Sequence, residues 1–343
     1  MLKYELQTAA DRLIRDIFAV QPEETVVITA DTSSNFDVVD AVASSVVAVG
    51  AKPMVITVKT PGGVGKAADP DLPVEALSAV LSKADVWLEF NHQWLLYSTP
   101  FSVAERANKK MRYMCLVDFE PGVMWRLLGK VDCSKLKEFM LHAKELHKKA
   151  KTMRVTTPAG TDVHFEMDQN HYMTCDYGDA TTPGIYMVPG QLNVVPKFGT
   201  VEGKIVFDGT VTPPFSSALK EPIVLTIEHG VIVKVEGGSQ AREYDAWLHS
   251  FEDEGMLKIA HVAYGFNPGA TLTGNVVEDE RVWGCTEWGI GFVSEIDAPP
   301  VGQDAKSHSD GICLNASVWL DDKPLMLDGK IVHEELVPLS PVK

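Results

Sequence analysis

The run Thr25-Val26-Val27-Ile28-Thr29-Ala30 is the first of four short β-rich segments in this chain. Stretches with apolar residues at helical spacing separate these segments, which predicts an alternation of strands and helices. Strands joined through helices must run parallel, because each helix carries the chain back to the edge of the sheet where the last strand began. The expected strands are Thr25–Ala30, Pro53–Val58, Val86–Phe90 and Tyr113–Val117, and the expected helices are residues 2–20, Val38–Val49, Val74–Ser82, Phe101–Lys110 and Ser134–Lys149.

The character of the chain changes after residue 150. Met153–Thr157 and Asp162–Met167 flank Pro158-Ala159-Gly160-Thr161, which is a hairpin signal. Further β-rich runs follow, with one clear helical run: Val201–Phe207, Ile223–Glu228, Val231–Glu236, Leu314–Leu320 and Ile331–His333, with the helix at Ala241–Glu252. We therefore predict an α/β fold, with a Rossmann-like parallel-sheet domain over residues 1–150 and a β-rich α+β domain over residues 151–343.

Composition narrows the class of function. The chain has 343 residues, of which 45% are apolar and 23% charged, as in a soluble globular protein of two domains. Its net charge of −16 argues against nucleic acid and against an anionic membrane surface as partners. The five cysteines show no CxxC spacing, so neither a disulfide framework nor a structural zinc site is expected. No apolar run reaches the roughly 18 residues of a membrane span, and no signal peptide is evident, so we expect a cytoplasmic enzyme.

His308-Ser309-Asp310 stands at the head of an alternating run that continues to Leu320. On an extended strand, residues two apart face the same side, so the imidazole of His308 and the carboxylate of Asp310 would lie together. Two such groups on one rigid face can supply two of the three ligands of a mononuclear metal site, and His261 is the best-placed third. The alternatives are a surface pair for His308 and Asp310 and a hydrogen-bonded core position for His261.

Glu287 stands among aromatic residues and glycines, in Trp283-Gly284-Cys285-Thr286-Glu287-Trp288-Gly289-Ile290-Gly291. Burial in such a setting would raise the pKa of its carboxyl group, because desolvation disfavours the charged form. A general base that works near neutral pH needs a pKa of that kind. The alternative is a partly exposed loop glutamate.

Two other patterns are interpreted as structural. Pro61-Gly62-Gly63-Val64-Gly65-Lys66 is flanked by Thr60 and Ala67, where a phosphate-binding P-loop needs a glycine and a Ser or Thr. A flexible loop is therefore expected there. His142 and His147 lie in a Lys-rich helix and are interpreted as part of its solvated face.

The stretch Ala260-His261-Val262-Ala263-Tyr264-Gly265-Phe266-Asn267-Pro268-Gly269, with the later His308-Ser309-Asp310-Gly311 and Leu320-Asp321-Asp322, resembles the 2,5-dihydroxypyridine 5,6-dioxygenases. It is also similar to their relatives, the aminopeptidase T-type metalloaminopeptidases. The resemblance is loose over most of the chain and close over residues 256–330. In the dioxygenases the pattern HxxxGxxP…HxD…LDD supplies a His-His-Asp triad on iron. The resemblance assigns that triad to His261, His308 and Asp310.

The sequence differs from both the dioxygenases and the aminopeptidases at positions that bear on the reaction. The aminopeptidases carry glutamates where this chain has His261 and Gln191, so the resemblance implies that their two-metal site is absent. The dioxygenases carry substrate-facing histidines near Tyr97 and Tyr186. At the position of Glu287 the dioxygenases are apolar, whereas the aminopeptidases carry a metal-binding histidine.

These features together predict a mononuclear metal-dependent hydrolase that opens the ring of a small cyclic ketone or hydroxylated ring, as a dihydrophloroglucinol cyclohydrolase would. One divalent ion (Mn, Fe or Zn) would lower the pKa of a bound water. Glu287 would act as the base, and Tyr97 and Tyr186 would position or protonate the substrate. Gln191 and Tyr264 are expected to line the substrate pocket, and the chain is expected to form a homo-oligomer.

Three alternatives are left open. The same triad on Fe(II) suits a ring-cleaving dioxygenase. A metalloaminopeptidase is more distant, because its paired carboxylates are missing. A non-catalytic binding protein would hold no tightly bound metal and would not depend on His308.

Overall fold

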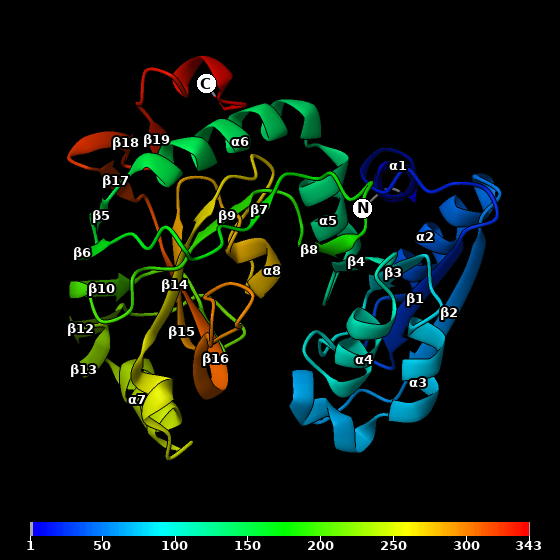
Figure 1. Ribbon diagram of the computed structural model, residues 1–343, viewed down its shortest axis with the longest axis horizontal. Coiled ribbons are helices and arrows are strands. Elements are labelled where there is room, and N and C mark those ends of the chain that lie inside the picture. The colour runs from blue at the N-terminus through cyan, green and yellow to red at the C-terminus, as the bar shows by residue number, and fades with distance from the viewer. Residues whose placement is uncertain (1–2, 343) are drawn as a thin grey trace. The chain divides into compact units, whose positions relative to one another are not determined.

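The computed structural model describes residues 3–342, and the chain divides into two compact units. The first unit extends to Cys133 and also contains Gly178–Pro189. The second contains Ser134–Tyr177 and the chain from Gly190 onward. The first unit has a parallel sheet and the second has antiparallel sheets, so the predicted α/β fold class is confirmed (Figure 1).

The first unit alternates strands and helices, as the sequence predicts. Its elements are α1 (Lys3–Arg12), β1 (Thr25–Asp31), α2 (Phe36–Ala48), β2 (Lys52–Val58), α3 (Val74–Leu81), β3 (Val86–Glu89), α4 (Thr99–Ala107), β4 (Arg112–Cys115), α5 (Pro121–Met124) and β8 (Gly184–Tyr186). The strands form one parallel sheet in the order β2-β1-β3-β4-β8. β3 and β4 are buried at every position, which is the pattern of parallel strands covered on both faces.

The second unit contains the other strands of residues 3–342. Its elements are α6 (Cys133–Lys149), β5 (Thr152–Thr156), β6 (Asp162–Glu166), β7 (Cys175–Asp176), β9 (Gln191–Val194), β10 (Glu202–Phe207), β11 (Val211–Thr212), β12 (Ile223–Glu228), β13 (Val231–Gly237), α7 (Ser239–His249), β14 (Ile259–Gly265), α8 (Val276–Asp279), β15 (Thr286–Val293), β16 (Gln303–Cys313), β17 (Ser317–Leu320), β18 (Lys323–Leu327) and β19 (Lys330–Ile331). One sheet has the order β13-β12-β10-β6-β5-β17-β18-β19, and the other has the order β11-β16-β15-β14-β9-β7.

The boundary predicted at residue 150 differs from these units in two places. From Ser134 onward α6 belongs to the second unit, where Phe139 packs edge-on against Phe266 with ring centroids 5.1 Å apart. Residues Gly178–Pro189 return to the first unit, because β8 pairs in parallel with β4. The second unit therefore begins before residue 150 and is interrupted once.

Alternate residues of β15 and β16 pack against the other sheet of the second unit. Trp288 is fully buried, and its ring lies 6.1 Å from that of Phe165 on β6. Gly311 lies so close to Phe207 on β10 that an added Cβ would come within 2.3 Å of the aromatic ring. Because successive side chains of a strand point to opposite faces, the neighbours of these residues project from the other face of the sheet.

The alternating run from His308 to Leu320 is two strands and not one. β16 ends at Cys313, and β17 begins at Ser317 in the other sheet. Asn315 has a φ of +52°, a left-handed conformation that asparagine tolerates better than most residues. The chain therefore changes sheets between Cys313 and Ser317, a short distance after the two predicted ligands of β16.

Tyr264, predicted to line a substrate pocket, lies in the core of the second unit instead. Its ring is fully buried, and its hydroxyl donates to Nε2 of His147 at 2.7 Å. Nδ1 of His147 in turn donates to the carbonyl of Ala143 at 2.7 Å. Burial lowers the pKa of His147 to about 4, so the ring is neutral. The interpretation of His147 as solvated is therefore wrong, because α6 turns that residue inward.

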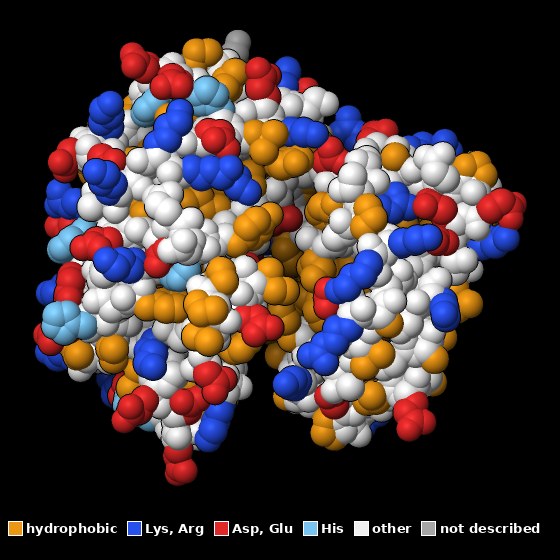
Figure 2. Space-filling model, in the orientation of Figure 1, with side chains coloured by type: hydrophobic (Ala, Val, Ile, Leu, Met, Phe, Trp, Pro, Cys, Tyr) orange, Lys and Arg blue, Asp and Glu red, His pale blue; other side chains and the backbone are white. Residues whose placement is uncertain are grey.

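Acidic and basic side chains are interspersed over the second unit on the face that Figure 2 shows at the left. Over residues 3–342, the helices fall short of the length and apolar character that a membrane crossing requires.

Replacement of Tyr264 by Phe should lower the free energy of unfolding by about 1–3 kcal/mol, because Nε2 of His147 would be left buried without a donor. Urea denaturation measures this loss. Tyr172→Phe is the matched control, since Tyr172 is 53% exposed and its replacement should change stability little. Equal stability of Tyr264→Phe and the wild type would contradict the structural role of this hydrogen bond.

Candidate metal centre

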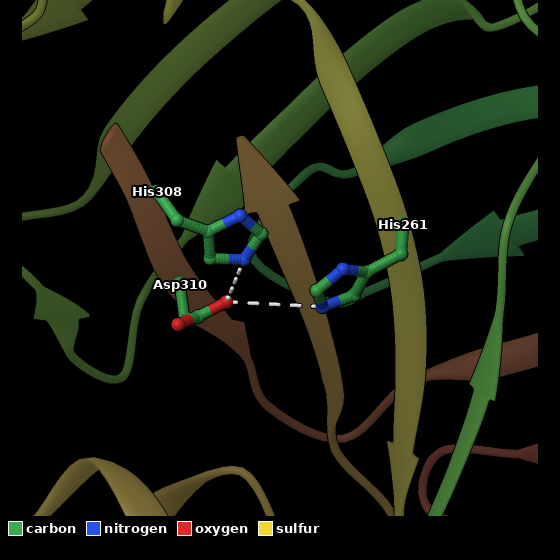
Figure 3. Close-up of side chains that lie close together, drawn as sticks. All are labelled: His261, His308 and Asp310. Carbon is green, nitrogen blue, oxygen red and sulfur yellow. Dashed lines mark hydrogen bonds and ion pairs between the residues drawn. The ribbon is translucent and has the colours of Figure 1, made fainter. Parts of the chain in front are cut away.

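Three neighbouring strands of the second unit bring the predicted metal ligands together (Figure 3). His261 lies on β14, and His308 and Asp310 lie on β16. β15 runs between them. Gly289 pairs with His261 on one side and with Asp310 on the other, and Gly291 pairs with His308. Paired residues of a sheet face the same way, so all three side chains project from one face.

The ligand atoms of these three side chains all lie within 4.8 Å of one another. Nε2 of His308 is 2.9 Å from Oδ1 of Asp310, and Nε2 of His261 is 3.7 Å from the same oxygen. The two imidazole rings are stacked, with centroids 5.1 Å apart and an angle of 21° between their planes. The structure thus produces the convergence on which the metal-site hypothesis depends.

A backbone carbonyl fixes the orientation of His308. Nδ1 lies 2.8 Å from the carbonyl oxygen of Phe292, so Nδ1 carries a proton and Nε2 is the nitrogen left for a ligand. Burial by itself would lower the pKa of His308, but the neighbouring Asp310 carboxylate outweighs it and raises that pKa. Proteins orient metal-binding imidazoles through a hydrogen bond of this kind on the opposite ring nitrogen.

Gly289 provides the space that the His261 ring occupies. A Cβ at Gly289 would lie 2.4 Å from Cε1 and 2.6 Å from Nδ1 of His261, which is closer than non-bonded atoms approach. A glycine within a strand often marks a place where another group comes close to the backbone. Any side chain at this position would displace the imidazole from Asp310.

Glu287, on β15, is a further ionisable side chain of the site. It is fully buried, and its Oε2 is 3.1 Å from Nε2 of His261. Burial raises the pKa of Glu287 well above its usual range, and the carboxylates of Asp310 and Glu280 raise it further. Burial also acts to raise the pKa of Asp310, but His308 outweighs it and the pKa of Asp310 is lowered. Of these two carboxyls, Asp310 therefore ionises more readily.

A buried hydrogen-bonded group holds Glu280 beside the site. Its Oε2 accepts from Nε2 of Gln191 at 3.0 Å and from Nη1 of Arg281 at 2.9 Å. Nη2 of Arg281 donates to Oε1 of Gln191 at 3.0 Å. Burial raises the pKa of Glu280 to about 7 although Arg281 acts in the opposite direction. Each end of the Gln191 amide makes one of these hydrogen bonds, so Gln191 positions Glu280 and Arg281. The contact of Gln191 with a substrate stays a prediction.

This set of donors fits a divalent metal ion. Imidazole nitrogens and carboxylate oxygens together bind first-row metals such as iron. Within residues 3–342, Oε1 of Glu287 is buried without a hydrogen-bonding partner, and an orphaned buried oxygen indicates that an ion or a water completes the site. A cation would also offset the negative charge of the neighbouring carboxyls. His261, His308 and Asp310 are the residues that would hold it.

Tyr97 and Tyr186, predicted to act on the substrate, belong to the first unit. Tyr97 is 48% exposed, and its φ of +68° is left-handed, which is uncommon for an aromatic residue. The hydroxyl of Tyr186 donates to the carbonyl of Thr182 at 2.8 Å. Their contact with a substrate stays a prediction.

Sequence reasoning missed Glu280, Arg281 and the role of Gly289. Glu280 and Arg281 end the charged stretch Glu278-Asp279-Glu280-Arg281, which has the composition of a solvated turn, yet all four residues are buried. No local pattern separates a buried charged stretch from an exposed one. Gly289 and Gly291 did offer a signal, because glycines at alternate positions of a strand leave one face bare.

Comparison with known proteins identifies the family. The family model described as NicX: 2,5-dihydroxypyridine 5,6-dioxygenase matches residues 14–333. The chain belongs to this family. A curated 2,5-dihydroxypyridine 5,6-dioxygenase from Pseudomonas putida KT2440 is 31% identical over 224 residues. That match spans 63% of this chain and 63% of the length of the relative.

Two solved structures share the fold of this family member. The 2,5-dihydroxypyridine dioxygenase of Pseudomonas putida KT2440 superposes with a TM-score of 0.81 at 23% identity, over 98% of this chain and 99% of its own. Wild-type AmpT from Thermus thermophilus gives a TM-score of 0.69 at 16% identity, over 97% of this chain and 100% of its own. The resemblance to the dioxygenases inferred from the sequence is thus confirmed, and the likeness to AmpT is one of fold.

The family assignment overturns the predicted ring-opening hydrolase. As a member of the 2,5-dihydroxypyridine 5,6-dioxygenase family the chain is an enzyme, but the family agrees with the dioxygenase alternative and the hydrolase prediction is wrong. The predicted role of Glu287, a base that activates water, belonged to that hydrolase reaction.

Replacement of Gly289 by Ala should weaken the binding of Mn²⁺ by about 10- to 100-fold, because the added methyl group would displace the His261 ring. Calorimetric titration measures the affinity. Gly311→Ala is the matched control: it adds a methyl group to the opposite face, against Phe207. That variant should lose stability and keep its affinity. Unchanged binding by Gly289→Ala would show that His261 does not need this space.

Proposed function

We propose that this chain is a metal-dependent dioxygenase that cleaves a dihydroxylated pyridine or a similar small hydroxylated ring. The observation that carries the proposal is the convergence of His261, His308 and Asp310 within 4.8 Å, in a chain whose residues 14–333 match the 2,5-dihydroxypyridine 5,6-dioxygenase family. The curated relative with that activity matches over 63% of its length, which supports the same reaction class here.

The proposed cofactor is Fe²⁺, held by His261, His308 and Asp310. Two histidines and one carboxylate that leave coordination positions open are the ligand set of non-haem Fe(II) oxygenases, and the ion supplies the oxygen chemistry when it is bound. The hydrogen bond from Nδ1 of His308 to Phe292 supports this assignment, because it leaves Nε2 as the ligand atom.

The proposed substrate carries ring hydroxyls, and these need a proton acceptor in the site. Glu280 has the properties required. Its side chain keeps 11% of its surface accessible, and Gln191 and Arg281 hold one of its oxygens in place. A carboxyl whose pKa is raised to about 7 exchanges protons near neutral pH. We assign to Glu280 the removal of a proton from a ring hydroxyl.

Oxygen uptake tests the proposed function. The protein is first reconstituted with Fe²⁺ under anaerobic conditions and then exposed to O2 and substrate. It should consume O2 in a 1:1 ratio with 2,5-dihydroxypyridine or a related ring, because both oxygen atoms enter the product. An oxygen electrode and chromatography of the product measure the ratio. Ring opening without oxygen consumption would reject a dioxygenase.

His308→Ala should lower the rate of ring cleavage by about 100-fold or more. Replacing a residue that only supports a metal ligand costs up to about 100-fold in activity, and the loss of the ligand itself should cost at least as much. His164→Ala is the matched control, since His164 is an exposed histidine on β6 in the other sheet of the same unit. A His308→Ala enzyme with full activity would remove the metal centre from the mechanism.

A further inference from the structure

Glu287 has no place in the three-ligand site, yet it lies against a ligand atom. Its Oε2 is 3.1 Å from Nε2 of His261, the same nitrogen that faces Oδ1 of Asp310 at 3.7 Å. Its carboxyl group and that of Asp310 are also close enough to share a hydrogen bond. Glu287 therefore contacts the ligand atom of His261 and interacts with the carboxyl group of Asp310.

The distances are those of ligands around one ion. Two donor atoms that are each about 2.1 Å from a metal and at right angles to each other are separated by about 3 Å. Nε2 of His308 and Oδ1 of Asp310 are 2.9 Å apart, and Nε2 of His261 and Oε2 of Glu287 are 3.1 Å apart. The second pair matches this separation as well as the first.

A supporting hydrogen bond to His261 does not account for Glu287. A carboxylate that orients a metal-binding imidazole contacts the ring nitrogen that points away from the metal. The carbonyl of Phe292 does this for His308, at Nδ1. Glu287 instead contacts the nitrogen of His261 that points into the site, where a metal ligand would lie.

The second oxygen of Glu287 gives an independent indication. Glu287 is fully buried, and its Oε1 has no hydrogen-bonding partner among residues 3–342. A buried carboxyl oxygen without a partner is costly unless an ion or a water satisfies it. We propose that Glu287 is a fourth ligand of the metal ion, which would then be held by two histidines and two carboxylates.

A fourth ligand changes the charge and the open positions of the site. Two carboxylates cancel the charge of a divalent ion, whereas one leaves it in excess. An octahedral ion with four protein ligands keeps two positions for other groups, and with three it keeps three. The inference concerns metal binding itself and does not rest on the ring-cleaving reaction.

Metal titration in the absence of substrate and oxygen tests the fourth ligand. Glu287→Gln should weaken Mn²⁺ binding by about 10- to 100-fold, and it should change the visible absorption spectrum of the Co²⁺ form, which reports the ligands around the ion. Glu287→Asp keeps a carboxylate on a shorter side chain, so its affinity for Mn²⁺ should lie between those of the wild type and Glu287→Gln. Thermal unfolding of the metal-free proteins verifies that each variant folds.

Glu280→Gln is the matched control, because it removes a carboxyl from the same buried region while Gln191 and Arg281 occupy that carboxyl's Oε2. It should leave the Co²⁺ spectrum unchanged. A Glu287→Gln protein with wild-type affinity and spectrum would overturn the proposal. Equal effects of Glu287→Gln and Glu280→Gln on the Mn²⁺ affinity and the Co²⁺ spectrum would also overturn it, since both variants would then act through charge alone. A wild-type protein that binds metal as expected but cleaves no ring would reject the proposed function and leave this inference standing.

Discussion

The site exists because one strand contributes no side chain at its centre. Neighbouring strands of a sheet are about 4.8 Å apart, so the backbones of β14 and β16 are separated by about 10 Å. An imidazole from one and a carboxylate from the other can meet only above the strand between them. Gly289 keeps that strand bare at this position: a Cβ there would lie 2.4 Å from the His261 ring. The convergence of the ligands is thus a property of the sheet register, and the register is fixed by the pairing of β15 with both neighbours.

The opposite face of the same strands explains why this register is stable. Trp288 and Gly311 turn toward the other sheet, where Phe165 and Phe207 lie against them. A shift of one residue would move Trp288 to the polar face and the ligands into the core. Burial of a large aromatic side chain contributes on the order of 2–3 kcal/mol, which such a shift would forfeit. Packing on the apolar face therefore fixes the strand register, and the register in turn positions the ligands on the opposite face.

The sequence was sufficient for whatever depends on local periodicity. The alternation of strands and helices up to Cys115 predicted the parallel sheet, and the two-residue spacing of His308 and Asp310 predicted that they share a face. The sequence was insufficient for strand pairs and hydrogen-bonded side chains whose two partners lie far apart along the chain. The pairing of β8 with β4 joins residues about 70 positions apart (Arg112 with Gly184), and no local pattern marks it. For the same reason Tyr264 seemed available to a substrate, when its hydroxyl is bound to His147 on α6.

The reaction could not be inferred from the ligands because the same donors serve different chemistries. Two imidazoles and a carboxylate on a divalent ion can activate a water or support oxygenation. What separates the two is the state of the other groups in the site. A hydrolase needs a carboxylate that accepts a proton from water, and a Glu287 bound to the metal ion as proposed would not be free to do so. Glu280 differs: burial raises its pKa, and Arg281 acts in the opposite direction, so that the pKa is raised only to about 7. Two glutamates in one buried cluster thus differ in their neighbours, since Arg281 binds Glu280, and this difference is why we assign proton exchange with a ring hydroxyl to Glu280.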